Sequence, residues 1–156
     1  MTKSLPDELL SVLQEVVKIV NYIKSWPLNT RLFNAVCQEM GADHQSLLFH
    51  TEVRWLSRGK VLSRIYELKN ETQTFLEAQG SDFASLFKKE GWAAKLAYLA
   101  GIFAHLNELN KKMQGRNSNI LTSLDKIESF RAKLVLWISH ATTGSNEMFP
   151  NVMAAD

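Results

Sequence analysis

The residues best suited to chemistry in this chain are basic and aromatic, and they lie in one stretch: Arg54, Trp55, Arg58, Lys60 and Arg64. Guanidinium and ammonium groups neutralise phosphates, and an indole offers a stacking face for an unpaired base. Residues 54–69 hold five basic side chains and one acidic side chain, a local net charge of +4, whereas the whole chain carries +2. This combination of residues would suit a contact with single-stranded or distorted nucleic acid.

The same charges have an explanation that needs no DNA. If the stretch is helical, Lys60 and Arg64 lie beside Glu67 and Glu71, because residues three or four apart share one face of a helix. Ion pairs between them would make this an ordinary solvated face. The residues alone leave both explanations open.

Other chemistry finds little support. The carboxylates show no spacing that would bring two of them together, and we interpret them as helix caps or solvated charges; they include Asp7, Glu8, Asp43, Glu52, Asp82, Glu108, Asp125 and Glu128. His44 and His50 could share a metal with Glu52, but this spacing matches no known ligand pattern. We expect no metal, no cofactor and no small-molecule substrate.

Cys37 is the only cysteine, which excludes an intrachain disulfide and any site built on a pair of cysteines. It lies on an apolar helix face with no basic neighbour, so we expect a buried side chain and not a nucleophile. The N-terminus lacks the apolar run of a signal peptide, and no segment is long enough to span a bilayer. We expect an intracellular protein that does not bind membranes.

The apolar spacing predicts a mainly all-α fold made of a helical hairpin and a helical bundle. Helices are expected at about 7–26, 30–40, 58–79, 92–114 and 120–140, with a shorter one after Ser81 that carries Phe83, Leu86 and Phe87. Asn29 and Ser57 are expected to cap helix starts, while Gly41, Gly80, Gly91 and Gly115 are expected to end or interrupt helices. Alternation near 47–55 indicates at most one short strand.

The same spacing predicts which side chains face the core. In 58–79 they are Val61, Ile65, Leu68, Thr72, Phe75 and Leu76. In 120–140 the apolar residues that recur at helical spacing are Leu121, Leu124, Ile127, Phe130, Leu134 and Trp137. In 92–114, Ala93, Ala97, Ala100 and Gly101 leave room for a close helix neighbour.

Several runs of the chain resemble the hAT-type transposase-derived proteins of animal genomes, a group that includes BED-type zinc-finger, SCAN-domain and general transcription factor II-I repeat-domain proteins. The most specific run is His50-Thr51-Glu52-Val53-Arg54-Trp55-Leu56-Ser57-Arg58-Gly59-Lys60. Further matching residues lie at 16–24, 28–29, 33, 61–62, 96–99, 102–103, 105–110, 114–115 and 125–127. The resemblance covers nearly the whole chain.

This resemblance implies an origin in a transposase whose RNase H-like core holds an Asp, Asp, Glu metal triad, with a helical domain inserted before the final Glu. It also implies that Trp55 stacks on a flipped base, with Arg54 beside it at the DNA, since a stacking partner offsets the stacking lost on base extrusion. The catalytic acids of the family are expected before and after this chain, so we expect no enzymatic activity.

We therefore expect three parts: 1–80 with the Arg-Trp motif, 81–144 from the helical insertion domain, and a loose tail at 145–156. The expected function is that of a non-catalytic fragment of a domesticated or degenerate hAT transposase, located in the nucleus. It would contact DNA, or it would bind a protein partner or a second copy through an apolar face that the RNase H sheet would otherwise cover. The alternatives are a structural helical adaptor that binds no DNA, or part of an active transposase if a longer chain exists.

Overall fold

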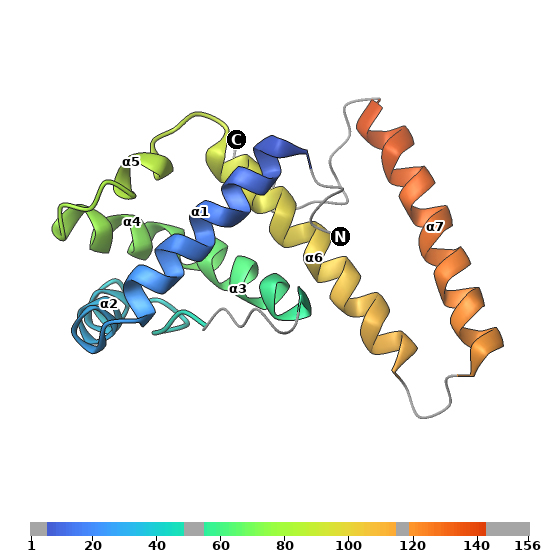
Figure 1. Cartoon of the computed structure of the whole chain (residues 1–156), viewed down its shortest axis with the longest axis horizontal. Helices are drawn as coiled ribbons and strands as arrows, with labels where there is room; N and C mark the ends of the chain where they lie inside the picture. Colours follow the sequence, from blue (N-terminus) through green and yellow to red (C-terminus); the bar gives the residue numbers. More distant parts are fainter. Residues whose placement is uncertain (1–5, 49–54, 115–118, 143–156) are drawn as a thin grey trace.

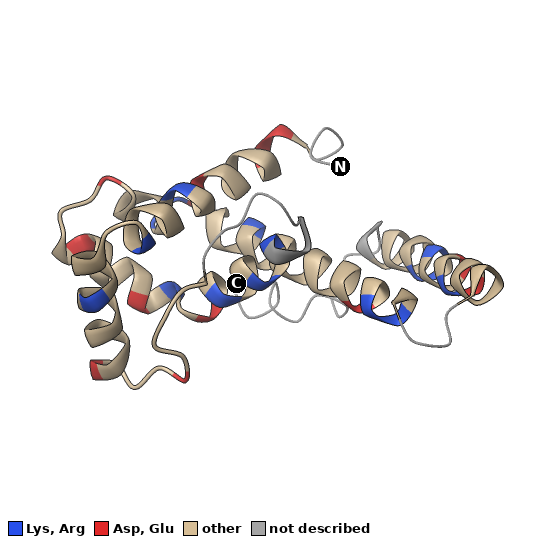
Figure 2. Ribbon diagram, turned by 60° about the horizontal axis from the view of Figure 1, so that its bottom comes forward, with Lys and Arg blue, Asp and Glu red and all other residues tan. Residues whose placement is uncertain are grey.

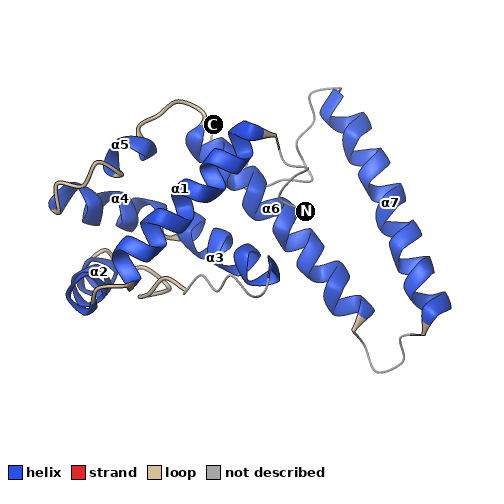
Figure 3. Cartoon of the chain, viewed as in Figure 1, coloured by secondary structure: helices blue, strands red, loops and turns tan. Residues whose placement is uncertain are grey.

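The computed structural model describes residues 6–48, 55–114 and 119–142, and these form helices connected by loops (Figure 1). The helices are α1 (Asp7–Lys24), α2 (Pro27–Glu39), α3 (Trp55–Glu67), α4 (Lys69–Ala78), α5 (Ala84–Phe87), α6 (Trp92–Met113) and α7 (Ile120–Thr142). No strand occurs within the described ranges (Figure 3). The predicted all-α fold is thereby confirmed, and none of the described helices is both long and apolar enough to cross a membrane.

Helices α1 and α2 form the predicted hairpin, with a different start for the second helix. Pro27 occupies the first turn of α2, a place that suits proline because the N–H it lacks would have no helical partner there. The expected cap at Asn29 is therefore wrong. Its side-chain amide instead donates to the carbonyl oxygen of Tyr22 (3.0 Å), and the Thr30 hydroxyl donates to that of Ile23 (2.9 Å). These two bonds connect the start of α2 to the end of α1.

The single helix expected at 58–79 is two helices, which meet at Leu68. The backbone of Leu68 has φ −95° and ψ 28°, outside the helical values, although its N–H still donates to Arg64 O (3.0 Å). Leu68 and the predicted inward residues on both sides of it are buried, so the bend keeps both helices on the core. The helix also begins earlier than expected, at Trp55, so Ser57 is inside α3 and the predicted strand does not reach Trp55. The rest of that strand prediction, at 49–54, falls outside the described residues.

Helix α6 is the central element, and α1, α3, α5 and α7 all contact it. Its buried residues, including Trp92, Leu96, Leu99 and Ala100, join those of α1 to α4 in one cluster. The most extensive contact between elements is that of α3 with α6. The predicted parts 1–80 and 81–144 therefore contribute to one core. Their division at Gly80 remains a prediction about which part of the ancestral transposase each segment comes from.

Helix α7 is at one edge of the molecule and has α6 as its principal neighbour (Figure 1). Four of the apolar residues that recur along it, Leu121, Leu124, Ile127 and Leu134, are exposed. The side chains nearest α6 come from another side of the helix, where Trp137 stacks on His105 with 4.5 Å between ring centroids and meets Phe130 edge-on. Periodicity identified an apolar face of this helix, but nothing in the described part of the chain covers it.

Candidate nucleic-acid interface

The predicted DNA contact falls at the beginning of α3. Trp55 is the first residue of that helix, and Arg58 and Lys60 follow in its first two turns. Arg54 lies outside the described residues, as does the side chain of Trp55. The geometry of the candidate interface therefore rests on Arg58, Lys60 and Arg64.

The inner face of α3 fixes the direction in which these side chains point. Val61, Leu62 and Ile65 are buried against the core. At Gly59 the helix approaches α6 so closely that an added Cβ would lie 3.0 Å from Cβ of Phe103 and 3.2 Å from its carbonyl oxygen, and would collide with the Asn107 amide nitrogen. Only glycine permits this approach without displacement. Gly59, part of the most specific run in the sequence, thus has a clear packing role.

Arg58 and Lys60 leave the helix on different sides, because two residues turn an α-helix by about 200°. Lys60 is exposed, whereas Arg58 is partly buried and its Nε atom is shielded from solvent without a hydrogen-bond partner in the described part of the chain. Neither residue has an ion pair with a described carboxylate. Neither positive charge is therefore compensated by a carboxylate among the described residues.

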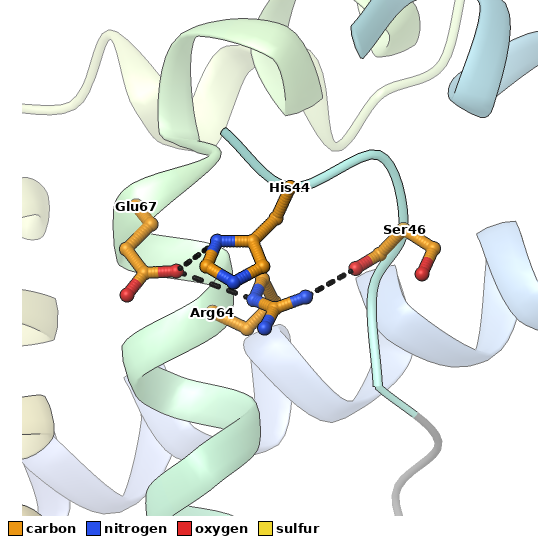
Figure 4. A network of polar contacts seen from close by, with 4 residues as sticks. All are labelled: His44, Ser46, Arg64 and Glu67. Atoms are coloured by element: carbon orange, nitrogen blue, oxygen red, sulfur yellow. Dashed lines mark hydrogen bonds and ion pairs between the residues drawn. The ribbon is translucent and has the colours of Figure 1, made fainter. Parts of the chain in front are cut away.

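Arg64 is held in a network on the outer side of α3 (Figure 4). Its Nε donates to Glu67 Oε2 (3.2 Å), and its Nη1 donates to the carbonyl oxygen of Ser46 (3.0 Å). The same Glu67 oxygen lies 3.2 Å from His44 Nδ1. The ion-pair explanation offered for the basic stretch is thus confirmed for Arg64 with Glu67, but not for Lys60.

The consequence is a structural role for Arg64. Its guanidinium connects α3 to the loop that follows α2, and Leu47 of that loop is buried in the core. This loop leads directly into the Arg-Trp motif along the chain. Arg64 therefore holds the loop at Ser46, and of the described candidates only Arg58 and Lys60 have no carboxylate partner within the described residues.

Elsewhere, basic and acidic residues are intermixed over the helices (Figure 2). Several lysines form close ion pairs, among them Lys95 with Glu8 (2.6 Å), Lys112 with Glu108 (2.6 Å) and Lys88 with Glu77 (2.9 Å). Hydrogen bonds from these lysines, with the attraction of their charges, lower the pKa of each of the three carboxyl groups. These lysine charges are matched locally, which sets Arg58 and Lys60 apart from them.

Sequence reasoning missed two contacts that shape this region. The first is the proximity of Asn107 and Phe103 to Gly59, and the small residue at Gly59 was the only signal that could have indicated it. The second is the bond from Arg64 to Ser46, which joins residues 18 apart in the sequence. No helical or strand periodicity predicts a contact of that kind.

The sequence also raised a metal site and a cysteine nucleophile. Among the described residues, no three His, Cys, Asp or Glu side chains lie close enough to hold a metal ion. The metal site considered from the sequence includes His50 and Glu52, which lie outside the described residues. Cys37 is fully buried, and burial, reinforced by the charge of Glu71, raises the pKa of its thiol to about 11. A thiol that stays protonated at neutral pH is a poor nucleophile, so the expected core role of Cys37 agrees with its surroundings.

Comparison with known proteins gives one match that covers most of the chain. Residues 3–142 match the family model described as the FAM200/GTF2IRD2 helical domain, of the FAM200-GTF2IRD2-like family. The match includes all seven described helices and the candidate interface at the start of α3. No solved structure gives a significant match to the chain.

Proposed function

The chain belongs to the FAM200/GTF2IRD2-like helical domains, a family of transposase-derived proteins, and from this premise we propose that it is a non-catalytic module that contacts nucleic acid through the start of α3. The contact would include Arg54, Trp55, Arg58 and Lys60. The observation that carries the proposal is that Arg58 and Lys60, three and five residues after Trp55, have no carboxylate partner among the described residues. Phosphate groups are anions that would compensate both charges.

The resemblance to hAT-type transposases gives this contact its chemical form. We propose that Trp55 stacks on an unpaired base and that the neighbouring basic residues hold the backbone on either side of it. Arg58 and Lys60 emerge on different sides of α3, an arrangement that suits a bent or single strand better than one straight row of phosphates. The proposal also includes descent from an RNase H-like hAT core, residence in the nucleus and the absence of catalysis by this chain.

The test is a binding titration with fluorescently labelled DNA. The chain contains four tryptophans, so the anisotropy of a labelled oligonucleotide is a cleaner readout than protein fluorescence. We expect a single-stranded or hairpin oligonucleotide to bind more tightly than a duplex of the same length. Affinity should fall as the salt concentration rises. The slope of the logarithm of the binding constant against the logarithm of salt concentration should become shallower by roughly 0.7 for each phosphate contact removed from a single strand.

Three variants make the test specific. Trp55→Ala should weaken single-strand binding by about 1–3 kcal/mol, the usual value of one base stacked on an aromatic ring. Lys60→Glu should weaken binding and reduce the salt slope, whereas Lys18→Glu, an identical charge change at an exposed position of α1, should have a much smaller effect. Circular dichroism of each variant would verify the helical fold. Absence of binding at 50 mM salt, or equal losses with Lys18→Glu and Lys60→Glu, would contradict the proposal.

A second candidate is a structural helical adaptor that binds no DNA. The exposed apolar residues of α7 favour it, because apolar side chains gathered on one surface commonly mark a protein interface. A stable assembly with a protein, indifferent to DNA and to Trp55→Ala, would support the adaptor over the nucleic-acid contact.

A further inference from the structure

Helix α7 has two unlike faces, and the more apolar one points away from α6. Toward α6 it places Trp137, which stacks on His105, with Phe130 beside it, and Lys126, which donates to the carbonyl oxygen of Lys112. Away from α6 is a set of exposed apolar residues, called the α7 stripe below: Ile120, Leu121, Leu124, Ile127, Leu134, Val135 and Ile138. The least exposed is Leu134 at 41% and the most exposed is Ile120 at 81%, so no described element covers any of them.

The α7 stripe has the spacing of a coiled-coil seam. Alternating steps of three and four residues connect Leu121, Leu124, Glu128, Arg131, Val135 and Ile138. Such a repeat keeps one face of a helix directed at a second helix over its whole length. Ile120, Ile127 and Leu134 recur at steps of seven beside this seam and widen its apolar surface.

Two charged residues, Glu128 and Arg131, occupy the middle of the seam. They pair weakly within the helix (3.8 Å) and both are well exposed. Before them along the seam come Leu121 and Leu124, and after them come Val135 and Ile138. The seam therefore shows the same pattern from either end of the helix: two apolar residues, two residues of opposite charge, and two apolar residues.

This symmetry selects a partner and an orientation. If a second copy of α7 lies antiparallel on the first, Leu121 faces Ile138 of the other copy and Leu124 faces its Val135. Glu128 then faces Arg131 of the other copy, and the two-fold axis repeats that pair. A parallel arrangement would instead place like charges opposite each other, which is unfavourable.

We propose that the α7 stripe is a self-association surface, on which α7 of a second copy of this chain packs antiparallel with reciprocal Glu128 and Arg131 pairs. The inference is independent of the proposed nucleic-acid contact, which is on α3. Helix α7 is at the edge of the molecule in Figure 1, and its 23 residues make a helix of about 35 Å, so a second helix has room to align along it. Burial of the apolar seam would supply the attraction, and the central charges would set the register.

Sedimentation equilibrium of the intact chain and its charge variants tests the proposal. The wild-type chain should sediment at micromolar concentrations as a dimer of twice its 17.7 kDa mass. Glu128→Lys and Arg131→Glu should each raise the dimer dissociation constant more than about tenfold, since each homodimer would then contain two pairs of like charges. Mixing the two variants in equal amounts should restore the dimer, because every cross-helix pair in the mixed assembly is again opposite in charge.

Ser129→Lys is the matched control, since Ser129 is exposed, next to the central pair and outside the seam; it should leave the dimer intact. A monomeric wild-type chain at 100 µM would overturn the proposal, and binding of an apolar dye to that monomer would indicate that another segment or protein covers the stripe. A wild-type dimer that both charge variants leave unchanged would also overturn it. So would variants that are monomeric alone and fail to associate when mixed.

Discussion

Gly59 of α3 lies against Phe103 of α6 at a distance that leaves no room for a side chain: a Cβ on Gly59 would be 3.0 Å from the Phe103 Cβ atom. The Phe103 carbonyl oxygen would be 3.2 Å away, so relief requires movement of the α6 backbone as well as of side chains. The most extensive helix contact among the described elements, that of α3 with α6, thus includes a tight approach within the stretch that carries the candidate interface. Packing at Gly59 and exposure of Lys60 are two consequences of one helix orientation.

Gly59→Ala should therefore destabilise the fold. In an open helix this substitution stabilises by about 1 kcal/mol, because alanine is the better helix former. Overpacking of a tight contact costs about 1–3 kcal/mol, and we expect it to exceed the gain, with a net loss on the order of 1 kcal/mol. Urea unfolding of the two proteins measures the difference.

Asn107→Ala provides the control for this prediction, since it removes the amide that the new methyl group would meet first. The loss of unfolding free energy caused by Gly59→Ala should be smaller in the Asn107→Ala background. The double-mutant cycle gives the coupling energy between the two positions. A Gly59→Ala protein as stable as the wild type would show that α3 and α6 can separate freely.

The hydrogen bond between Trp92 and Glu15 should also contribute to stability. The indole Nε1 of Trp92, a buried residue, donates to Glu15 Oε2 at 2.7 Å and joins α6 to α1 across 77 residues of sequence. Hydrogen bonds to charged groups contribute about 1.5–3 kcal/mol, so Glu15→Ala should lower the free energy of unfolding by about that amount. Glu15→Gln keeps an acceptor oxygen and should lose less. Glu39→Ala, at an exposed position of α2, serves as the control and should change stability by less than about 0.5 kcal/mol.

Arg64 should hold the loop before the Arg-Trp motif, and its replacement should loosen that loop. Arg64→Met keeps the aliphatic stem but removes both the Glu67 pair and the bond to Ser46 O. Because Glu67 is half-exposed, solvent screens the ion pair, and the expected loss of stability is only about 1 kcal/mol, mainly from the bond to the carbonyl.

The more specific readout of Arg64→Met is hydrogen exchange. Amides of residues 44–48 should exchange faster, while those of α1 stay protected. Lys60→Met removes from the same helix an exposed lysine that has no ion pair with any described residue, and it should alter neither exchange nor stability measurably. Unchanged exchange at 44–48 in the Arg64→Met protein would show that the loop is held without this network.

Much of the fold follows from the sequence because its signals are local. The helix at α1 is evident from apolar residues such as Val16 and Val20 and from Pro27 beyond its end, and α6 follows from the same kind of spacing. The break at Leu68 does not follow, because Ile65 and Phe75 continue the same periodic pattern on both sides of it. Periodicity records which side of a helix is apolar, and it is insensitive to a bend that leaves that side buried.

The orientation of α7 and the details of the candidate interface depend on distant contacts. Spacing alone identified an apolar face with Leu124 and Leu134, but which face another element covers is decided by that element, here α6. Likewise, the outward direction of Lys60 is a local property of α3. The hydrogen bond from Arg64 to Ser46 is not a local property of α3, since Ser46 belongs to a loop whose path no helical rule predicts.

The buried thiol of Cys37 should make stability depend on pH in alkaline solution. Its pKa is raised from 9.0 to about 11, chiefly by burial, so between these values the thiolate forms in the unfolded chain but not in the folded one. Ionisation then favours unfolding: the contribution of this group is fully present below pH 9 and is lost as pH rises toward 11. Comparing chemical unfolding at pH 8 and pH 10 for wild type and Cys37→Ala isolates the effect, since the alanine variant should lose less stability over that interval.

In the native wild type at pH 8, a thiol reagent should react only as fast as the chain opens, because the thiol is both protonated and enclosed by the core. Rapid stoichiometric labelling without denaturant would mean that the Cys37 region of α2 opens readily.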